Sequence, residues 1–320
     1  MSQQPIAIVI HGGAGTIERG DMTPEQDKAY RAKLTEVLEA GYAVLEKDGH
    51  AIDAVQAAVE ILEDSPLFNA GRGAVFTRGG VNQLDASIMD GATLNAGAVG
   101  AVEHIAHPIK LARAVMTESP HVMLVGRGAE DFAWAHGFKF TPAGWFYTER
   151  RWQAHIKGLE NLDAASAGAP ERIAGKRGWA YGTVGAVALD RSGHIAAGTS
   201  TGGLTNMLDG RVGDSPTIGA GTYADDATCG ASGTGVGEFY MRLNLTKSIS
   251  DLMEMKGWSL KKAADTMVNK RLVKLGGENT GGVIALDAKG DVVTPFNTPG
   301  MYRGWIGTDG KLVVKIYRDE

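Results

Sequence analysis

The sequence predicts a fold in which layers of helices cover stacked β-sheets. The first half of the chain alternates apolar runs typical of strands with segments of helical periodicity. The second half begins with strands, continues with two helices and ends with strands. Glycine accounts for 45 of the 320 residues, about twice its usual share, which indicates many tight turns. Because a helix or a sheet must bury its apolar face against another element, this order favours packed layers.

The elements of the first half follow from end signals and periodicity. Thr23, Pro24 and Gln26 form a capping box with proline at the first helical position, so a long helix begins there and Gly49 stops it. The other predicted elements, in order, are a strand in "PIAIVIHGGAG", a second helix that ends near 65–66, a loop into a strand in "LFNAGRGAVFTRGG", a strand in "NAGAVGAVEHIAHP", a helix from 108 to about 117, a strand at 121–126 and a short helix from about 128.

The apolar pattern disappears between 159 and 182, where alanine, glycine, serine and charged residues dominate. We expect this segment to be a flexible linker or an exposed loop. Strands return after it as hairpins, and 238–257 has helical periodicity. Ser259 caps a further helix that runs to about 276, "TGGVIALDAKGDVVTPF" forms a last pair of strands, and "KLVVKIY" reads as an edge strand.

An internal similarity joins two of these hairpins. The segment that begins at Thr183 matches the one that begins at Thr280, with Gly, Ala-Leu-Asp and a second Thr at the same offsets. We expect two hairpins of one design, with Asp190 and Asp287 opening the turns. A threonine ahead of such a hairpin is therefore explained by architecture alone.

Charge and cysteine content exclude several classes of protein. The formal net charge is −5 and the basic residues form no extended cluster, which argues against nucleic acid or an acidic membrane surface as a partner. Cys229 is the single cysteine, so an internal disulfide is excluded and a reducing compartment is indicated. The apolar run at 6–10 is too short for a signal peptide core or a membrane span. We expect a cytoplasmic protein.

Common catalytic and cofactor motifs are absent from the sequence. It contains no GxxxxGK[ST], HExxH or CxxC. The run "GTGVG" resembles a dinucleotide fingerprint, but its third glycine comes too early and Glu238 stands where that glycine is needed. These absences leave threonine as the candidate nucleophile.

Thr183 follows Gly182 directly after the patternless segment. A threonine hydroxyl is a weak nucleophile, but the α-amino group of an N-terminal threonine can act as its base at neutral pH. In the intact chain that nitrogen is an amide. If the Thr183 hydroxyl attacked the Gly182 carbonyl, the peptide bond would become an ester that water opens, and Gly182 tolerates the backbone angles that such an attack needs.

Polar residues downstream fit this chemistry. The hairpin that starts at Thr183 returns at "GTSTGG", so the hydroxyls of Thr199, Ser200 and Thr201 are expected beside it. "GRVGDSP" places Arg211 and Asp214 in one loop, where they would bind the carboxylate and the ammonium group of an amino acid, or else pair with each other structurally. "ASGTGVGE" supplies backbone amides and the hydroxyl of Thr234 for an oxyanion.

The chain resembles the plant-type, or type III, L-asparaginase/isoaspartyl peptidase family of N-terminal nucleophile hydrolases. The resemblance covers nearly the full length and is carried by "HGGAG", "SPLFNAGRGAVFT", "LDASIMDG", "GTVGAVALD", "TSTGG", "GRVGDSP", "GTGVGE" and "PFNTPGMYRGW" in that order. It implies an α+β fold built as a four-layer αββα sandwich. It also implies cleavage into an α-subunit, 1–182, and a β-subunit, 183–320, which assemble as a dimer of αβ units, a heterotetramer.

The resemblance also implies the role of each site residue. Thr183 would be the nucleophile and, through its freed amine, the base, and Thr201 would orient its hydroxyl. Thr234 and Asn69 would form the oxyanion hole. Arg211 and Asp214 would hold the substrate's α-carboxylate and α-amine, and Gly235 and Gly237 would line the pocket. Catalysis would need no cofactor. Backbone carbonyls would hold a structural sodium ion, those of Leu62, Glu63, Ser65, Phe68, Ala70 and Arg72, the last being a position where the family usually has an apolar residue.

The function expected from the resemblance is hydrolysis of β-aspartyl (isoaspartyl) dipeptides, with secondary L-asparaginase activity. A glycosylasparaginase shares the nucleophile and is an alternative within the enzymes. An unprocessed binding protein that keeps the pocket but never frees the amine is an alternative of another class. Intact-mass measurement and N-terminal sequencing separate these readings.

Overall fold

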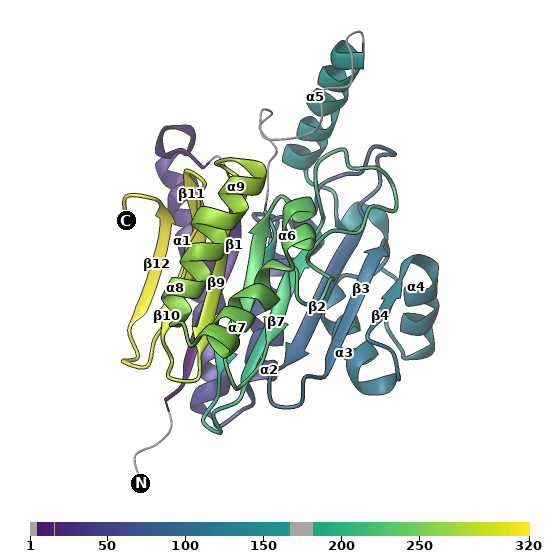
Figure 1. The fold of residues 1–320 in the computed structure, drawn as a ribbon. Helices are drawn as coiled ribbons and strands as arrows, with labels where there is room; N and C mark the ends of the chain where they lie inside the picture. The colour runs from purple at the N-terminus through teal and green to yellow at the C-terminus, as the bar shows by residue number, and fades with distance from the viewer. Residues whose placement is uncertain (1–4, 16, 167–181) are drawn as a thin grey trace.

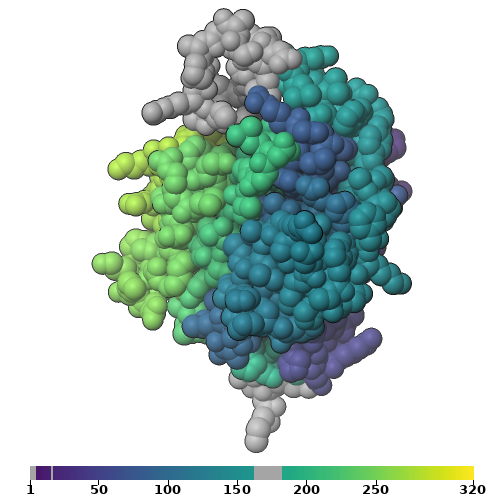
Figure 2. Space-filling model, turned by 90° about the vertical axis from the view of Figure 1, so that its right-hand side faces the viewer, coloured from purple at the N-terminus to yellow at the C-terminus, as the bar shows by residue number. Residues whose placement is uncertain are grey.

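The two β-sheets of the protein pack face to face between outer layers of helices (Figure 1). The structure, a computed structural model, describes residues 5–15, 17–166 and 182–320. This arrangement is the predicted αββα sandwich. The blue-to-teal first part of the chain and the green-to-yellow second part lie side by side along the molecule (Figure 2).

The larger sheet has eight strands and carries the site. All its neighbouring strands pair antiparallel except the last two, β3 and β4, which are parallel. In spatial order its strands are β12 (Leu312–Tyr317), β11 (Gly300–Ile306), β1 (Ala7–Gly15), β5 (Val184–Leu189), β6 (Ile195–Thr201), β2 (Leu84–Asp90), β3 (Ala96–Val102) and β4 (Met123–Val125). The predicted edge strand β12 lies at the edge, as expected.

The smaller sheet has four strands and packs on the inner face of the larger one. Its strands are β10 (Val292–Val293), β9 (Gly281–Asp287), β8 (Cys229–Gly235) and β7 (Thr222–Ala224). Side chains between the sheets come from alternate positions, such as Val9 and Val187 from one sheet and Ile284 from the other. Ile8 and Ile10, the residues on either side of Val9 on β1, face the helices instead. Burial on both faces explains why β1 is a continuous apolar run.

Helices cover the outer face of each sheet. Those on the larger sheet are α1 (Pro24–Glu46), α2 (Ala51–Asp64), α3 (Pro108–Glu118) and α4 (Gly126–Ala135). Those on the smaller sheet are α6 (Gly237–Leu243), α7 (Leu245–Lys256), α8 (Leu260–Asp265) and α9 (Val273–Gly276), with a π-helical stretch at Thr266–Leu272 between the last two. The predicted caps are confirmed: Thr23 forms a capping box with Gln26, and the Ser259 side chain accepts from the Lys262 amide.

The two predicted hairpins are confirmed and lie in different sheets. β5 and β6 form one in the larger sheet, and β9 and β10 form the other in the smaller sheet. In each turn one aspartate oxygen accepts two backbone amides, those of residues 192 and 194 at Asp190 and those of residues 289 and 291 at Asp287. The two similar segments therefore share a hairpin turn that an aspartate side chain closes.

Two predictions of local structure are wrong. The helix α5 (Glu149–Ser166) extends into the segment predicted as linker, so 159–166 is helical, and the rest of that segment up to 181 lies outside the described residues. Leu159, Glu160 and the alanines near its end are good helix formers, and a helix that projects from the sandwich needs no continuous apolar stripe (Figure 1). No strand follows the 3₁₀ turn Gly71–Gly73, because the Val75 amide donates to the Asn69 side chain.

The strands β2 and β11 were not predicted, although motifs of the family resemblance cover both. Each contains charged or small residues, such as Asp85 and Gly304, that mask an apolar pattern in the sequence. Both are held by neighbours distant in sequence: β2 by β3 and β6, and β11 by β1 and β12. Long-range pairing therefore determines them more than local propensity does.

Candidate active site

Thr183 lies at the start of β5, in the middle of the larger sheet. Its side chain is almost buried, and its hydroxyl donates to the Thr201 hydroxyl at 3.2 Å. The register of the hairpin, in which Val184 pairs with Ser200, brings these two hydroxyls together across the strands. The prediction that Thr201 lies beside Thr183 is confirmed.

The peptide bond before Thr183 is held from both sides. The backbone N–H of Asn69 donates to the Gly182 carbonyl oxygen at 3.0 Å. On the other side, a Cβ at Gly13 would lie 2.5 Å from the Cα of Gly182, and Gly13 has a φ of +111°. Only glycine fits there, because a side chain would collide with Gly182 and strain the backbone. The carbonyl that the Thr183 hydroxyl would attack is thus fixed by a hydrogen-bond donor.

The side chain of Asn69 is engaged elsewhere. Its amide nitrogen donates to the Gly203 carbonyl at 2.7 Å, and its amide oxygen accepts the Val75 amide at 3.0 Å. The contact of Asn69 with the candidate scissile carbonyl is therefore made by its backbone. The side chain fixes the loop that follows Thr201, whose own hydroxyl accepts the Gly203 amide at 3.0 Å.

Thr234 comes from the smaller sheet and faces the larger one. It is fully buried on β8, and its hydroxyl oxygen accepts the Ala14 amide of β1 at 3.1 Å. Among the described residues, no hydrogen bond joins Thr234 to Thr183. Gly235, the next residue, packs tightly on β9, where a Cβ would lie 2.2 Å from the Thr280 carbonyl oxygen.

Arg211 does not form an ion pair with Asp214 in the part of the chain that the structure describes. Its Nε and Nη2 both donate to one carboxylate oxygen of Glu238, at 3.1 and 3.0 Å. The simple structural alternative, an Arg–Asp loop pair, is thus absent. A Cβ at Gly237 would lie 2.6 Å from Asp214 Oδ1 and 2.8 Å from Arg211 Nη2, so glycine is required where both side chains converge.

Asp214 is a buried carboxyl group without a full set of partners. Burial raises its pKa to about 7, against the opposing effect of the Arg211 charge. Its Oδ2 has no hydrogen-bond partner among the described residues. A buried carboxylate with a free oxygen is suited to bind an ammonium group, which would supply both the charge and the donor that it lacks.

Three further residues support the site and were not predicted. His11 donates from Nδ1 to the Thr183 carbonyl oxygen at 2.9 Å, and its Nε2 accepts from Ser232 at 2.9 Å. Burial lowers the pKa of His11 to about 3, so the ring is neutral. Asp85 accepts the Gly213 amide at 3.1 Å and so fixes the loop of Arg211 and Asp214.

A chain of buried hydroxyl groups continues from His11 between the sheets. Ser232 and Thr199 lie 2.7 Å apart, Thr222 donates to Thr199, and Ser87 donates to Thr222 and to the Ser215 carbonyl. This series of hydrogen bonds therefore runs from the Thr183 carbonyl to the carbonyl of Ser215, the residue next to Asp214. No local motif indicates it, because its members come from four strands of two sheets.

The predicted sodium loop follows α2. Two of its carbonyls lie against a glycine turn: a Cβ at Gly71 would lie 2.3 Å from the Glu63 carbonyl oxygen, and one at Gly73 would lie 2.0 Å from that of Phe68. The carbonyls of Leu62 and Ala70 accept amides of the same loop. Each of these carbonyls keeps a second lone pair. Arg72 is exposed.

Side-chain metal clusters are not found in this structure. The described ranges hold no group of three or more His, Cys, Asp or Glu side chains placed to bind a metal ion. Of the helices described, none is long and apolar enough to cross a membrane.

The αββα sandwich, with a threonine at the start of a central strand of the larger sheet, is the fold of the N-terminal nucleophile hydrolases. Residues 3–316 match the family described as "Asparaginase". The chain is 46% identical over 317 residues to the isoaspartyl peptidase of Escherichia coli, covering 98% of this chain and 96% of the relative. It is 39% identical to the human isoaspartyl peptidase/L-asparaginase, over 99% of this chain and 97% of the relative. The chain belongs to the asparaginase family.

Proposed function

We propose that the chain cuts its own peptide bond between Gly182 and Thr183. The Thr183 hydroxyl attacks the Gly182 carbonyl carbon, and the oxyanion that forms is held by the Asn69 N–H, which already binds that oxygen. The C–N bond then breaks and the proton of the hydroxyl passes to the leaving nitrogen, which leaves an ester on the Thr183 oxygen and a free α-amine on Thr183. Water hydrolyses the ester, and the products are the chains 1–182 and 183–320.

The freed amine completes the catalytic group. In the mature protein it takes the proton from the Thr183 hydroxyl, which Thr201 orients through the 3.2 Å hydrogen bond. The hydroxyl attacks the side-chain amide carbonyl of a β-aspartyl substrate and forms a β-aspartyl ester. The amine returns the proton to the leaving nitrogen, and water, activated by the same amine, releases L-aspartate. Thr234 and Asn69 are the proposed oxyanion donors.

The α-carboxylate and α-ammonium groups of the substrate bind Arg211 and Asp214. Arg211 keeps its Nη1 free of Glu238 among the described contacts, so a substrate carboxylate can bind at Nη1 while Glu238 holds Nε and Nη2. The ammonium group supplies the cation that buried Asp214 lacks. Gly235 and Gly237 are the proposed glycines of the pocket lining, and a Cβ at Gly237 would lie 2.6 Å from Asp214 Oδ1.

The substrates we propose are β-aspartyl dipeptides, with L-asparagine as a secondary substrate. Relatives from E. coli and human carry the names isoaspartyl peptidase and isoaspartyl peptidase/L-asparaginase. These names favour β-aspartyl hydrolysis over glycosylasparaginase activity and over a silent binding protein. One observation carries the proposal. The Gly182 carbonyl accepts a hydrogen bond from the Asn69 N–H, and the hydroxyl of the next residue, Thr183, is held by Thr201.

Assembly, ion content and location are part of the same proposal. We propose a dimer of αβ units and a sodium ion held by the carbonyls of the loop after α2, which would rigidify the loop that carries Asn69. The buried free thiol of Cys229 is consistent with the reducing environment of the cytoplasm.

The test is intact-mass measurement over time, with N-terminal sequencing of the smaller fragment and an aspartate-release assay. The expected result is two fragments, one beginning at Thr183, and release of aspartate from β-aspartyl dipeptides. Thr183→Ala is expected to abolish both. A single species near 33.7 kDa after long incubation would contradict the proposal.

A further inference from the structure

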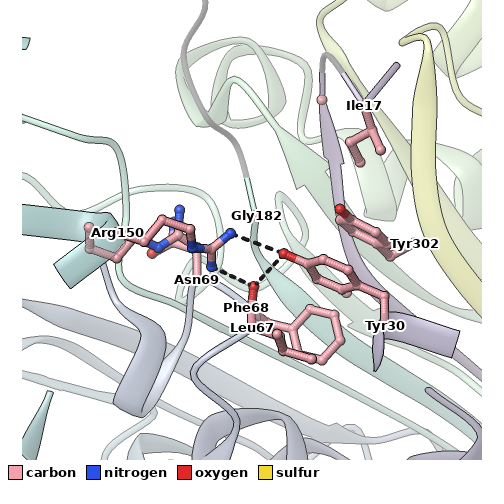
Figure 3. A pocket seen from close by; sticks show the side chains of 11 residues that line it. Ile17, Tyr30, Leu67, Phe68, Asn69, Arg150, Gly182 and Tyr302 are labelled. Atoms are coloured by element: carbon pink, nitrogen blue, oxygen red, sulfur yellow. Dashed lines mark hydrogen bonds between the residues drawn. The ribbon is translucent and has the colours of Figure 1, made fainter. Parts of the chain in front are cut away.

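A cavity of about 150 Å³ adjoins the candidate scissile bond (Figure 3). Gly182 and Asn69 form one side of it, and two adjacent residues of α5, Arg150 and Arg151, form another. Its other lining residues include Tyr30, Phe68, Tyr302, Leu67 and Ile17.

The two guanidinium groups at this cavity have no carboxylate partner in the described part of the chain. Arg150 donates to the Tyr30 hydroxyl and to the carbonyls of Pro66 and Leu67. Arg151 donates from Nε to the Gly73 carbonyl at 2.8 Å. Only 7% of Arg151 is exposed, and burial together with the Arg150 charge lowers its pKa to about 9. A buried cation with neutral partners favours the arrival of an anion.

Arg151 also lies close to Gly182. Its Nη2 is 3.8 Å from the position that a Cβ on Gly182 would occupy. A group that takes the place of Gly182 after cleavage is therefore within reach of this guanidinium.

The proposed chemistry determines which group that is. The Thr183 amine must give its proton to the nitrogen that leaves the substrate, so the two nitrogens must lie within about 3 Å of each other. The space next to the Thr183 nitrogen is the space that Gly182 fills in the uncut chain. The leaving residue of a β-aspartyl dipeptide consequently enters the space of Gly182, between Gly13, Asn69 and Arg151.

We propose that Arg151, with Arg150 beside it, binds the free carboxylate of the leaving residue. This inference rests on the proposed function and adds a subsite to it. The leaving residue best suited to the subsite carries a free α-carboxylate. Tyr30 stacks on Tyr302 with ring centroids 4.3 Å apart and packs edge-on against Phe68, which fixes the side of the cavity opposite the two guanidinium groups.

The subsite separates the two proposed substrates. A β-aspartyl dipeptide leaves as an amino acid with a carboxylate for Arg151. L-asparagine leaves as ammonia, which contacts neither guanidinium. The subsite therefore favours dipeptides over asparagine through the leaving group, while Arg211 and Asp214 treat the aspartyl half of both alike.

The experiment compares three substrates on the mature wild-type protein: β-aspartyl-phenylalanine, its C-terminal amide and L-asparagine. The free acid is expected to have a kcat/KM at least about tenfold above that of the amide, the size of effect of one charge-assisted hydrogen bond. Equal values for acid and amide would overturn the inference. If wild type cuts itself but hydrolyses none of the three, the proposed function itself fails.

Arg151→Gln then assigns the effect to its residue. It is expected to reduce kcat/KM at least about tenfold for the acid, with a far smaller change for the amide and for asparagine. Arg151→Lys, which keeps the charge, is expected to recover part of the loss on the acid. Arg127→Gln, a surface control whose side chain is 93% exposed, is expected to match wild type. Equal loss on all three substrates would show a structural role for Arg151 and would contradict the subsite.

Discussion

The imidazole of His11 donates a hydrogen bond to the carbonyl oxygen of Thr183 at 2.9 Å. That carbonyl belongs to the residue whose hydroxyl and nitrogen we propose to do the chemistry, so His11 fixes the backbone of the nucleophile without being a proton carrier. Its Nδ1 faces a carbonyl oxygen, which can only accept, so the proton resides on Nδ1 and Nε2 accepts from Ser232.

His11→Ala is expected to lower the free energy of unfolding by about 2–4 kcal/mol, because it removes two buried hydrogen bonds and leaves their partners unsatisfied. The measurement is urea denaturation in the Thr183→Ala background, so that cleavage does not alter the comparison.

The same residue predicts a pH dependence. Burial lowers the folded-state pKa of His11 to about 3 from 6.5, so its neutral form is required for folding. Stability is retained above pH 6.5 and is lost as pH falls from 6.5 towards 3, where only the unfolded chain binds the proton. The slope of stability against pH in that window should be smaller in His11→Ala than in its parent. Identical slopes would show that the ring is not buried in its neutral form.

Thr280 serves as the internal control for Thr183. Its hydroxyl donates to the Gly277 carbonyl at 3.0 Å and accepts from the Asn297 side-chain amide at 3.0 Å. Thr280→Ala is expected to cost about 1 kcal/mol of stability and to leave cleavage at 182–183 intact by intact-mass measurement. Loss of cleavage in a folded Thr280→Ala protein would show that the hairpin of Thr280, and not that of Thr183, supplies the nucleophile.

Asp214 should control the pH dependence of substrate binding. Its pKa is about 7 in the folded protein, so the carboxyl group gains a proton as pH falls below 7 and can no longer pair with an ammonium group. The KM for β-aspartyl dipeptides is expected to rise below pH 7, measured by aspartate release between pH 5.5 and about 8.5. A KM that does not change across that range would show that Asp214 does not bind the ammonium group of the substrate.

Asp214→Asn should also change stability in the absence of substrate. The folded-state pKa is raised above the unfolded value of 3.8, so the contribution of this group to stability is present below pH 3.8 and is lost as pH rises through 7. The asparagine variant is therefore expected to be more stable than its parent above pH 7, by thermal unfolding in the Thr183→Ala background, although it binds substrate more weakly.

Glu238→Gln tests how Arg211 is oriented. Because the Glu238 side chain is half exposed, its ion pair contributes at most about 1 kcal/mol to stability. We expect a several-fold rise in KM, normal cleavage at 182–183 and little change in melting temperature. An unchanged KM would show that Arg211 needs no partner to face the substrate.

The parts of the site that adjoin one another in sequence or across one hairpin were predictable. Thr183 and Thr201 belong to one antiparallel pair, so the position of one determines the position of the other. The turn aspartates Asp190 and Asp287 were predictable for the same reason, since their bonds are made within a few residues.

The rest of the site depends on how the sheets stack. His11 and Ser232 lie 221 residues apart in sequence and meet only because β1 and β8 face each other. The partner of Arg211 was also missed: Glu238 follows Gly237 at the start of α6, and only the folded loop brings the two side chains together. The helical end of α5 escaped prediction because it has no apolar stripe.

The larger sheet interleaves strands from both sides of the proposed cut. β1 lies between β11 and β5, and β6 pairs with β2, so the chains 1–182 and 183–320 alternate across the sheet. Severing the backbone would leave every one of these strand pairs in place, and the two chains could separate only by unfolding. Refolding would then be a second-order reaction between two polypeptides, each with an incomplete sheet, because the loop closure that once joined them is lost. Maturation would therefore make the native state a kinetic product, with a lifetime governed by its unfolding rate rather than by an equilibrium with the unfolded chain.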